Sequence, residues 1–146
     1  LVVRKWLQVQ SGANHADTLA NIKKLMKLPV YDRKLPKNIR SVVGVLAHSN
    51  PWVFHAADGA SYKLVASEIA IVDKFNPIIA ARLATAFQSW RDLEPKRQKL
   101  IERELKTLKA IKTLSRNTTE IVTKTLDMPA KTGMKIITPK AHKKAA

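Results

Sequence analysis

Residues 62–90 read YKLVASEIAIVDKFNPIIAARLATAFQSW, and this stretch decides the fold class. Its first part, Tyr62–Phe75, repeats apolar residues at the spacing of a buried helix face: Leu64, Val65, Ile69, Val72 and Phe75. Asn76 and Pro77 then provide a capping side chain and a first-turn proline, which start a second helix. Over residues 78–90, apolar side chains recur every three or four positions: Ile79, Leu83, Phe87 and Trp90. We therefore predict two consecutive helices joined by a short turn.

The same periodicity continues on both sides of this pair. Further helices are predicted over residues 17–28, 38–47, a short segment after Pro51, 96–112 and 118–126. Short links between amphipathic helices favour antiparallel neighbours stacked in pairs. The predicted fold class is all-α, a HEAT- or armadillo-like α-solenoid bundle. Only residues 134–138 have β-strand composition.

The last 19 residues differ in composition from the rest of the chain. They contain no acidic residue, two prolines, one glycine and five lysines: Lys131, Lys135, Lys140, Lys143 and Lys144. Such a segment buries too little apolar surface to fold alone. We predict a helical domain over 1–127 and an extended basic tail over 128–146, ordered only by a partner.

Charge is the most unusual property of the sequence. It holds 27 Lys and Arg against 11 Asp and Glu, a net charge of +16. This excess favours a polyanionic partner, either nucleic acid or an anionic membrane surface. Outside the tail, the predicted phosphate-binding residues are Lys23, Lys24, Lys27, Arg33, Lys34, Lys37, Lys99, Arg103, Lys106 and Lys109. The last four share one helix face, and Tyr31 and Trp52 are candidates for stacking on bases, whereas Trp90 belongs to a core stripe.

The sequence contains no recognisable set of catalytic residues. The sequence has no cysteine, no H-E-x-x-H pair, no glycine-rich phosphate loop and no apolar run long enough to cross a bilayer. His55 and Asp58 have a spacing that permits a hydrogen bond, and this is more often structural than catalytic. We therefore expect a non-enzymatic protein without a metal, a cofactor or a small-molecule substrate.

Several blocks of residues resemble a known family. They are NIRSVVG at 38–44, SNPWVFHAADG at 49–59 with Tyr62, DKFNP at 73–77, ARL at 81–83 and KRQ at 96–98. These blocks are similar to the C-terminal helical domain of zinc aminopeptidases of the alanyl aminopeptidase (aminopeptidase N) type, over roughly residues 1–126.

The resemblance implies a HEAT-like domain that closes over the active site of an upstream catalytic domain. It also implies that Arg40 and Arg82 face the internal chamber of the enzyme. The strong positive charge and the lysine-rich tail depart from what such a domain requires.

Three functions remain open at this point. The main hypothesis is a structural protein of a mitochondrial ribosome that contacts rRNA and neighbouring ribosomal proteins. The given sequence begins with Leu1 rather than Met, and this hypothesis explains that by the removal of a mitochondrial leader. The second is the chamber-closing domain of a longer zinc aminopeptidase. The third is a supernumerary subunit of a mitochondrial membrane complex that meets cardiolipin or acidic subunits.

Overall fold

The computed structural model describes residues 2–129, and all regular structure in that range is helical. The elements are α1 (Val2–Ser11), α2 (Thr18–Leu25), α3 (Pro36–Ile39), the π-helical η1 (Arg40–Gly44), α4 (Val45–Ser49), α5 (Pro51–Phe54), α6 (Ala60–Val72), α7 (Pro77–Ala84), the 3₁₀ turns η2 (Thr85–Phe87) and η3 (Trp90–Asp92), α8 (Pro95–Lys109) and α9 (Arg116–Leu126). The all-α prediction is confirmed. Residues 130–146 lie outside the description, so the predicted tail and its boundary stay predictions.

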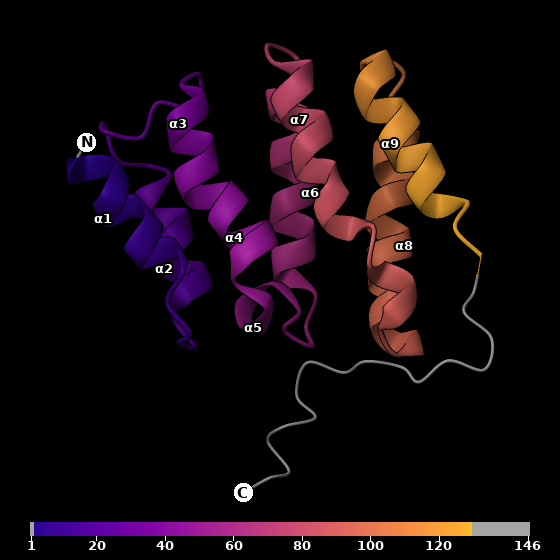
Figure 1. The fold of residues 1–146 in the computed structure, drawn as a ribbon, viewed down its shortest axis with the longest axis horizontal. Coiled ribbons are helices and arrows are strands. Elements are labelled where there is room, and N and C mark those ends of the chain that lie inside the picture. Colours follow the sequence, from indigo (N-terminus) through magenta and orange to yellow (C-terminus); the bar gives the residue numbers. More distant parts are fainter. Residues whose placement is uncertain (1, 130–146) are drawn as a thin grey trace, which may run out of the picture.

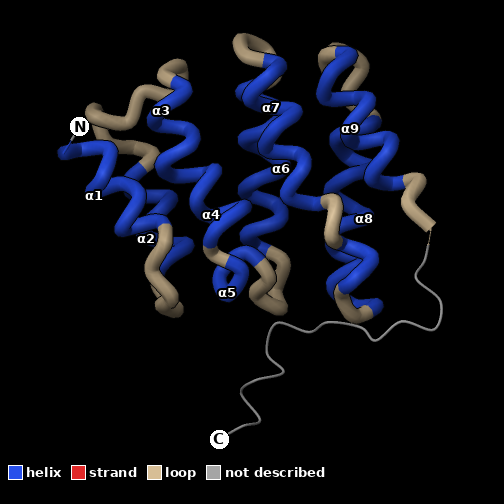
Figure 2. Tube along the Cα trace, viewed as in Figure 1, coloured by secondary structure: helices blue, strands red, loops and turns tan. Residues whose placement is uncertain are grey.

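The helices stand side by side in a row that follows the chain from one end of the molecule to the other (Figure 1). Helix α1 packs against α2, α6 against α7, and α8 against α9. Successive pairs are joined because α6 also contacts α8 and α7 contacts α9. Figure 2 shows that the loops connecting the helices lie at the ends of the helices. This confirms the predicted α-solenoid of stacked helix pairs.

Two of the helices begin at Asn-Pro pairs, as the sequence predicts. The side chain of Asn50 accepts a hydrogen bond from the Val53 amide at the start of α5. Asn76 accepts one from the Ile79 amide at the start of α7, 3.2 Å away. Each asparagine satisfies an amide that has no partner within the helix, while the following proline has no amide hydrogen to satisfy.

Residues 36–49 form one continuous helical segment, longer than the predicted 38–47. It begins as α3, widens into the π-helical η1 and continues as α4. The wider turn starts at Arg40 and ends at Gly44. Local π-helical turns are frequent at functional sites in proteins, which makes the surroundings of Arg40 a place to look for function.

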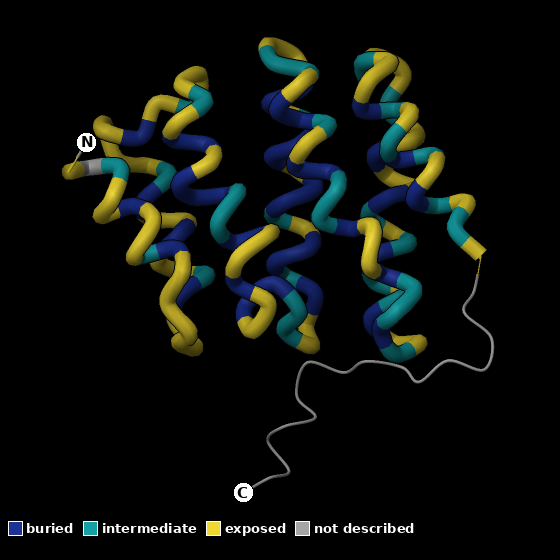
Figure 3. Tube along the Cα trace, in the orientation of Figure 1, coloured by how far each residue is buried: buried dark blue, intermediate teal, exposed yellow. Residues whose placement is uncertain are grey.

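The core runs between the helical layers (Figure 3). Ile79, Leu83, Phe87 and Trp90 are all buried as predicted. The predicted helix over 78–90 is wrong in its length, because α7 ends at Ala84 and the chain tightens into η2 and η3. Tighter turns still direct Phe87 and Trp90 inward. Phe75 was expected in the core, yet it is 40% exposed because α6 ends three residues before it.

The segment between α2 and α3 is held against the body of the protein. Arg33 Nε donates to Glu68 Oε1 of α6 over 3.0 Å, and Glu68 is itself buried. Tyr31 is also buried, so the prediction that it stacks on bases is wrong. Asn38 Nδ2 donates to the Val30 carbonyl over 3.2 Å. These contacts hold the basic loop in place, which the sequence alone did not indicate.

Candidate functional site

An exposed polar strip joins the segment 36–49 to α7. Arg40 and His48 are exposed on that segment, two helical turns apart. His48 Nε2 lies 3.2 Å from Thr85 Oγ1, just beyond α7. The Thr85 hydroxyl donates to the carbonyl of Arg82 over 2.6 Å, so His48 Nε2 is the donor in the first contact. We call Arg40, His48, Arg82 and Thr85 the arginine strip.

The two arginines of this strip are free to meet an outside anion. Within residues 2–129, neither Arg40 nor Arg82 forms an ion pair with a carboxylate. A guanidinium presents up to five N–H donors in a rigid plane that suits a carboxylate or phosphate. The structure therefore places the two predicted chamber-facing residues on neighbouring helices, with their donors available.

The sequence did not single out His48 or Thr85 as site residues. His48 follows Arg40 by eight positions on one helical segment, a spacing that returns to the same side of a helix. Thr85 comes from a different helix, and only the fold brings it to His48. The spacing of His48 from Arg40 was visible in the sequence. The position of Thr85 beside His48 depends on a long-range contact, which the sequence does not show.

A second polar cluster surrounds His55, at the turn between α5 and α6. His55 Nδ1 lies 2.7 Å from the Tyr62 hydroxyl, and Arg97 Nε of α8 donates to the His55 carbonyl over 2.7 Å. Arg97 also pairs with Glu94. Asp58 instead accepts from the Ala60 amide at the start of α6, so the anticipated His55–Asp58 contact is replaced by two separate ones.

Burial sets the protonation of this cluster. Burial, together with the positive charge of Arg97, lowers the pKa of His55 from 6.5 to about 4, and Glu94 opposes the shift. Burial also raises the pKa of the Tyr62 hydroxyl above its ordinary value. At neutral pH both groups are uncharged, and one hydrogen bond joins His55 Nδ1 to the Tyr62 hydroxyl. The cluster joins three segments through its hydrogen bonds, which is a structural role.

Most of the predicted phosphate-binding residues are exposed, but they do not form one surface. Lys23, Lys24, Lys27, Lys34 and Lys37 are exposed near α2 and α3, and Lys99, Arg103, Lys106 and Lys109 are exposed along α8. Helices α2 and α8 lie toward opposite ends of the row (Figure 1). The lysines of the tail fall outside the described residues.

Some of these cations already have protein partners. Arg33 pairs with Glu68, and Lys106 pairs with Glu102 one turn away on α8 at 3.2 Å. Lys99, Arg103 and Lys109 are exposed on the solvent side of α8, an amphipathic helix whose other side contributes Ile101, Leu105 and Leu108 to the core. Such a distribution is the ordinary one for a surface helix and needs no polyanion to explain it.

Residues 2–129 contain no group of three or more His, Asp or Glu side chains placed to hold a metal ion. No helix in the same range is long and apolar enough to cross a bilayer.

Comparison with known proteins identifies relatives over nearly the whole described chain. Residues 1–127 match the family described as "Domain of unknown function (DUF3458_C) ARM repeats". Aminopeptidase N of Caulobacter vibrioides is 36% identical over 126 residues, and that of Escherichia coli is 32% identical over 126 residues. These matches cover 86% of this chain but 15% and 14% of the two relatives.

A solved structure shows the same architecture. Aminopeptidase A of Legionella pneumophila, crystallised with aspartic acid, aligns with a TM-score of 0.80 and 32% sequence identity. The alignment covers 86% of this chain and 14% of that one. The resemblance to the C-terminal helical domain of aminopeptidases is thus confirmed. The matched domain is the non-catalytic one, and the chain spans about one seventh of its relatives' length.

These findings overturn the main functional hypothesis. The matched relatives are bacterial aminopeptidases, so the predicted mitochondrial ribosomal protein, its rRNA and ribosomal-protein partners and its mitochondrial location are wrong. The alternative of a supernumerary subunit in a mitochondrial membrane complex is wrong for the same reason. The hypothesis had rested on the net charge of +16, the lysine-rich tail and the absence of a catalytic domain, and none of these distinguishes a ribosomal protein from part of an aminopeptidase.

Proposed function

This chain belongs to the DUF3458_C family of ARM-repeat domains, and on that premise we propose that it serves as the C-terminal, chamber-lining domain of a zinc aminopeptidase. The observation that carries the proposal is the 36% identity to an aminopeptidase N over 86% of this chain. In this role the domain binds and positions peptides, and the metal and the catalytic residues belong to another part of the enzyme.

The arginine strip supports this function. Arg40 and Arg82 are exposed on adjacent helices and form no ion pair with the described carboxylates. Peptides carry a terminal carboxylate and acidic side chains, which suit a guanidinium. We propose that both arginines face the chamber and hold such groups. His48 links the two helices through its hydrogen bond to Thr85.

We further propose that the 146 residues have no peptidase activity by themselves. The sequence contains no H-E-x-x-H pair, and metallopeptidases of this type need the two histidines and the glutamate of that motif to hold zinc and activate water. The purified chain should therefore leave alanine 4-nitroanilide intact with or without added zinc.

The test is made on the native polypeptide that carries this sequence. We expect an intact mass several times 16.3 kDa and hydrolysis of N-terminal residues that stops when zinc is chelated. Replacing Arg82 by Ala in that enzyme should raise KM for peptides about fivefold with little change in kcat, because one charge-assisted contact is lost.

Lys109→Ala is the matched control, since it removes one positive charge from α8, away from the strip. It should leave KM unchanged. A native mass near 16.3 kDa without associated peptidase activity would refute the proposed function. Equal effects of the Arg82 and Lys109 substitutions would refute the role of the arginine strip alone.

A further inference from the structure

The arginine strip contains one side chain whose charge changes near neutral pH, His48. Its Nε2 donates to Thr85 Oγ1 over 3.2 Å, and the Thr85 hydroxyl donates in turn to the Arg82 carbonyl over 2.6 Å. A hydroxyl has one hydrogen, so these two bonds assign the hydrogen of the neutral His48 ring to Nε2. The other ring nitrogen, Nδ1, has no hydrogen-bond partner among the described residues, and the side chain is exposed.

Protonation of His48 therefore adds a charge without breaking the contact to Thr85. In a charged imidazole both nitrogens are donors, so Nε2 keeps its hydrogen bond and the new hydrogen is on Nδ1. The strip then carries three positive charges, at Arg40, His48 and Arg82, instead of two. Histidine is the side chain that makes this change between about pH 5 and 8.

The π-helical η1 brings Arg40 and His48 onto one side of their helical segment. Eight positions of an α-helix make about 2.2 turns, which would leave two side chains about 80° apart around the axis. In η1 the Val45 amide donates to the Arg40 carbonyl five positions back, so this turn takes in one extra residue. The interval becomes close to two whole turns, or roughly 10–12 Å along the axis. An extended peptide covers that distance with about three residues.

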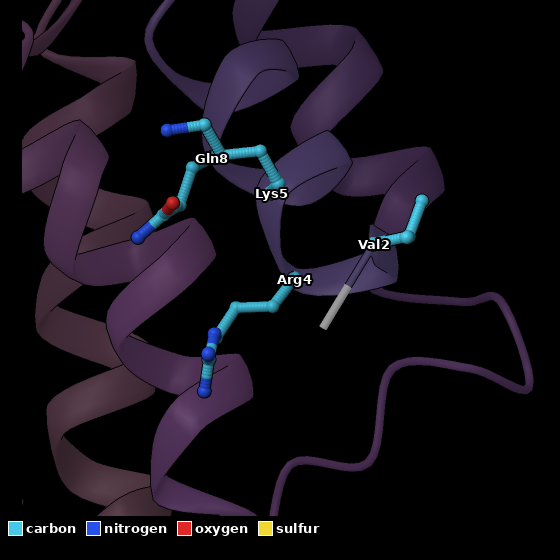
Figure 4. Close-up of a pocket in the computed structure, with 4 residues that line it drawn as sticks. All are labelled: Val2, Arg4, Lys5 and Gln8. Carbon is cyan, nitrogen blue, oxygen red and sulfur yellow. The ribbon is translucent and has the colours of Figure 1, made fainter.

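The helices around His48 contribute only permanent positive charges. Helix α4 packs against η1, α1 and α5, and His48 reaches the end of α7. The other charged side chains of these elements are Arg4 and Lys5 of α1, Arg40 of η1 and Arg82 of α7. Figure 4 shows Arg4 and Lys5 on α1, with Arg4 extending toward a neighbouring helix. All four stay charged between pH 5 and 8, so within these elements His48 alone titrates in that range.

We propose that His48 is a specificity-determining residue of the arginine strip, which in its protonated form binds a second carboxylate of the peptide and so selects acidic peptides as the pH falls. One carboxylate lies at Arg40, and the other lies at His48 and Arg82. An ionised carboxylate beside the ring favours its protonated form, so peptide binding and protonation reinforce each other. The inference rests on the proposed function, because it takes the strip to face the chamber that holds peptides.

The experiment uses the native polypeptide that carries this sequence and two substrates, Ala-Ala-Glu-Ala-Ala and Ala-Ala-Gln-Ala-Ala. Release of the N-terminal alanine gives kcat/KM for each peptide at pH 6 and pH 8. The glutamate is ionised at both pH values, and effects of pH on the catalytic step cancel in the ratio of the two kcat/KM values. We expect this ratio, the preference for the Glu peptide, to be about threefold higher at pH 6, which is the size of one exposed ion pair.

Three variants assign the pH dependence to a residue. In His48→Gln the preference should stay at its pH 8 value throughout, because glutamine keeps an N–H for Thr85 but does not titrate. In His48→Lys it should stay at the higher value, since the charge is permanent over this range. His15→Gln is the matched control: His15 is also exposed, but its ring lies beside Asp17, with Nδ1 3.7 Å from Oδ2. This variant should show the pH dependence of the natural enzyme.

A preference that is the same at pH 6 and pH 8 in the natural enzyme would overturn the inference. A pH dependence that persists in His48→Gln, or that disappears in His15→Gln, would overturn it as well. Each of these results leaves the proposed function standing as long as Arg82→Ala still raises KM. A native polypeptide without peptidase activity refutes the proposed function, and this inference fails with it.

Discussion

Lowering the pH from 7 to 4 should destabilise the fold through His55. The imidazole is hydrogen-bonded to Tyr62, with the two ring centres 5.7 Å apart, and Arg97 contacts the backbone of the same residue. Burial and the charge of Arg97 depress the pKa of His55 to about 4 in the folded state, against 6.5 in the unfolded chain. Glu94 opposes the shift and does not cancel it.

The sign follows from proton binding. Between pH 6.5 and 4 the unfolded chain binds a proton at His55 and the folded chain does not, so acid favours unfolding. The contribution of His55 to stability is complete above pH 6.5 and is lost as the pH approaches 4. After an allowance for the partial exposure of the ring, it amounts to about 2 kcal/mol.

Urea unfolding at a series of pH values measures this contribution. Other ionisable groups of the chain also bind protons in that range, and they are the same in both proteins. The informative quantity is therefore the difference between the unfolding free energies of the natural chain and the His55→Gln variant. We expect this difference to fall by about 2 kcal/mol between pH 7 and pH 4. Parallel curves for the two proteins would show that His55 titrates normally in the folded state and would refute the reasoning.

Three further substitutions test the packing, each measured by urea unfolding at pH 7. Leu83→Ala should cost about 2–5 kcal/mol because it empties a buried site; a smaller loss would mean that the surroundings collapse into the space. Gly59→Ala should cost about 1–2 kcal/mol, because Gly59 has φ +72° and a new Cβ would lie 3.1 Å from Leu100 Cδ1. Asp73→Ala should cost about 3 kcal/mol, since the buried carboxylate accepts from Ser115 and Thr118; an unchanged midpoint would contradict that role.

The features that could be predicted from sequence are those with a local cause. Asn50 and Asn76 precede prolines, and each caps its helix as the pattern indicates. The core stripe that ends at Trp90 was likewise visible in the periodicity of apolar residues. No glycine or proline marks the end of α7 at Ala84, and the predicted helix therefore ran on too far. The tertiary packing of Phe87 and Trp90 tolerates tighter turns there, and periodicity alone does not distinguish the two.

The features that could not be predicted depend on contacts between distant residues. Arg33 and Glu68 are 35 positions apart in the sequence, and their ion pair holds the basic loop between α2 and α3 against α6. Tyr31 is buried by the same arrangement. In the arginine strip, Arg40 and Arg82 were predicted from the family resemblance. The His48–Thr85 contact between their helices could be recognised only in the fold.

The positive charge shows why position carries more functional information than number. Arg33 and Arg97 serve the fold through ion pairs. The exposed basic residues of α8 stand on the solvent side of that amphipathic helix: Lys99, Arg103, Lys106 and Lys109. The net charge of +16 counts all of them equally. Arg40 and Arg82 are both exposed, form no ion pair with a described carboxylate and lie on helices linked by the His48–Thr85 contact. A charge acts on a ligand only where the fold leaves it unpaired, so functional tests belong at those positions rather than along α8.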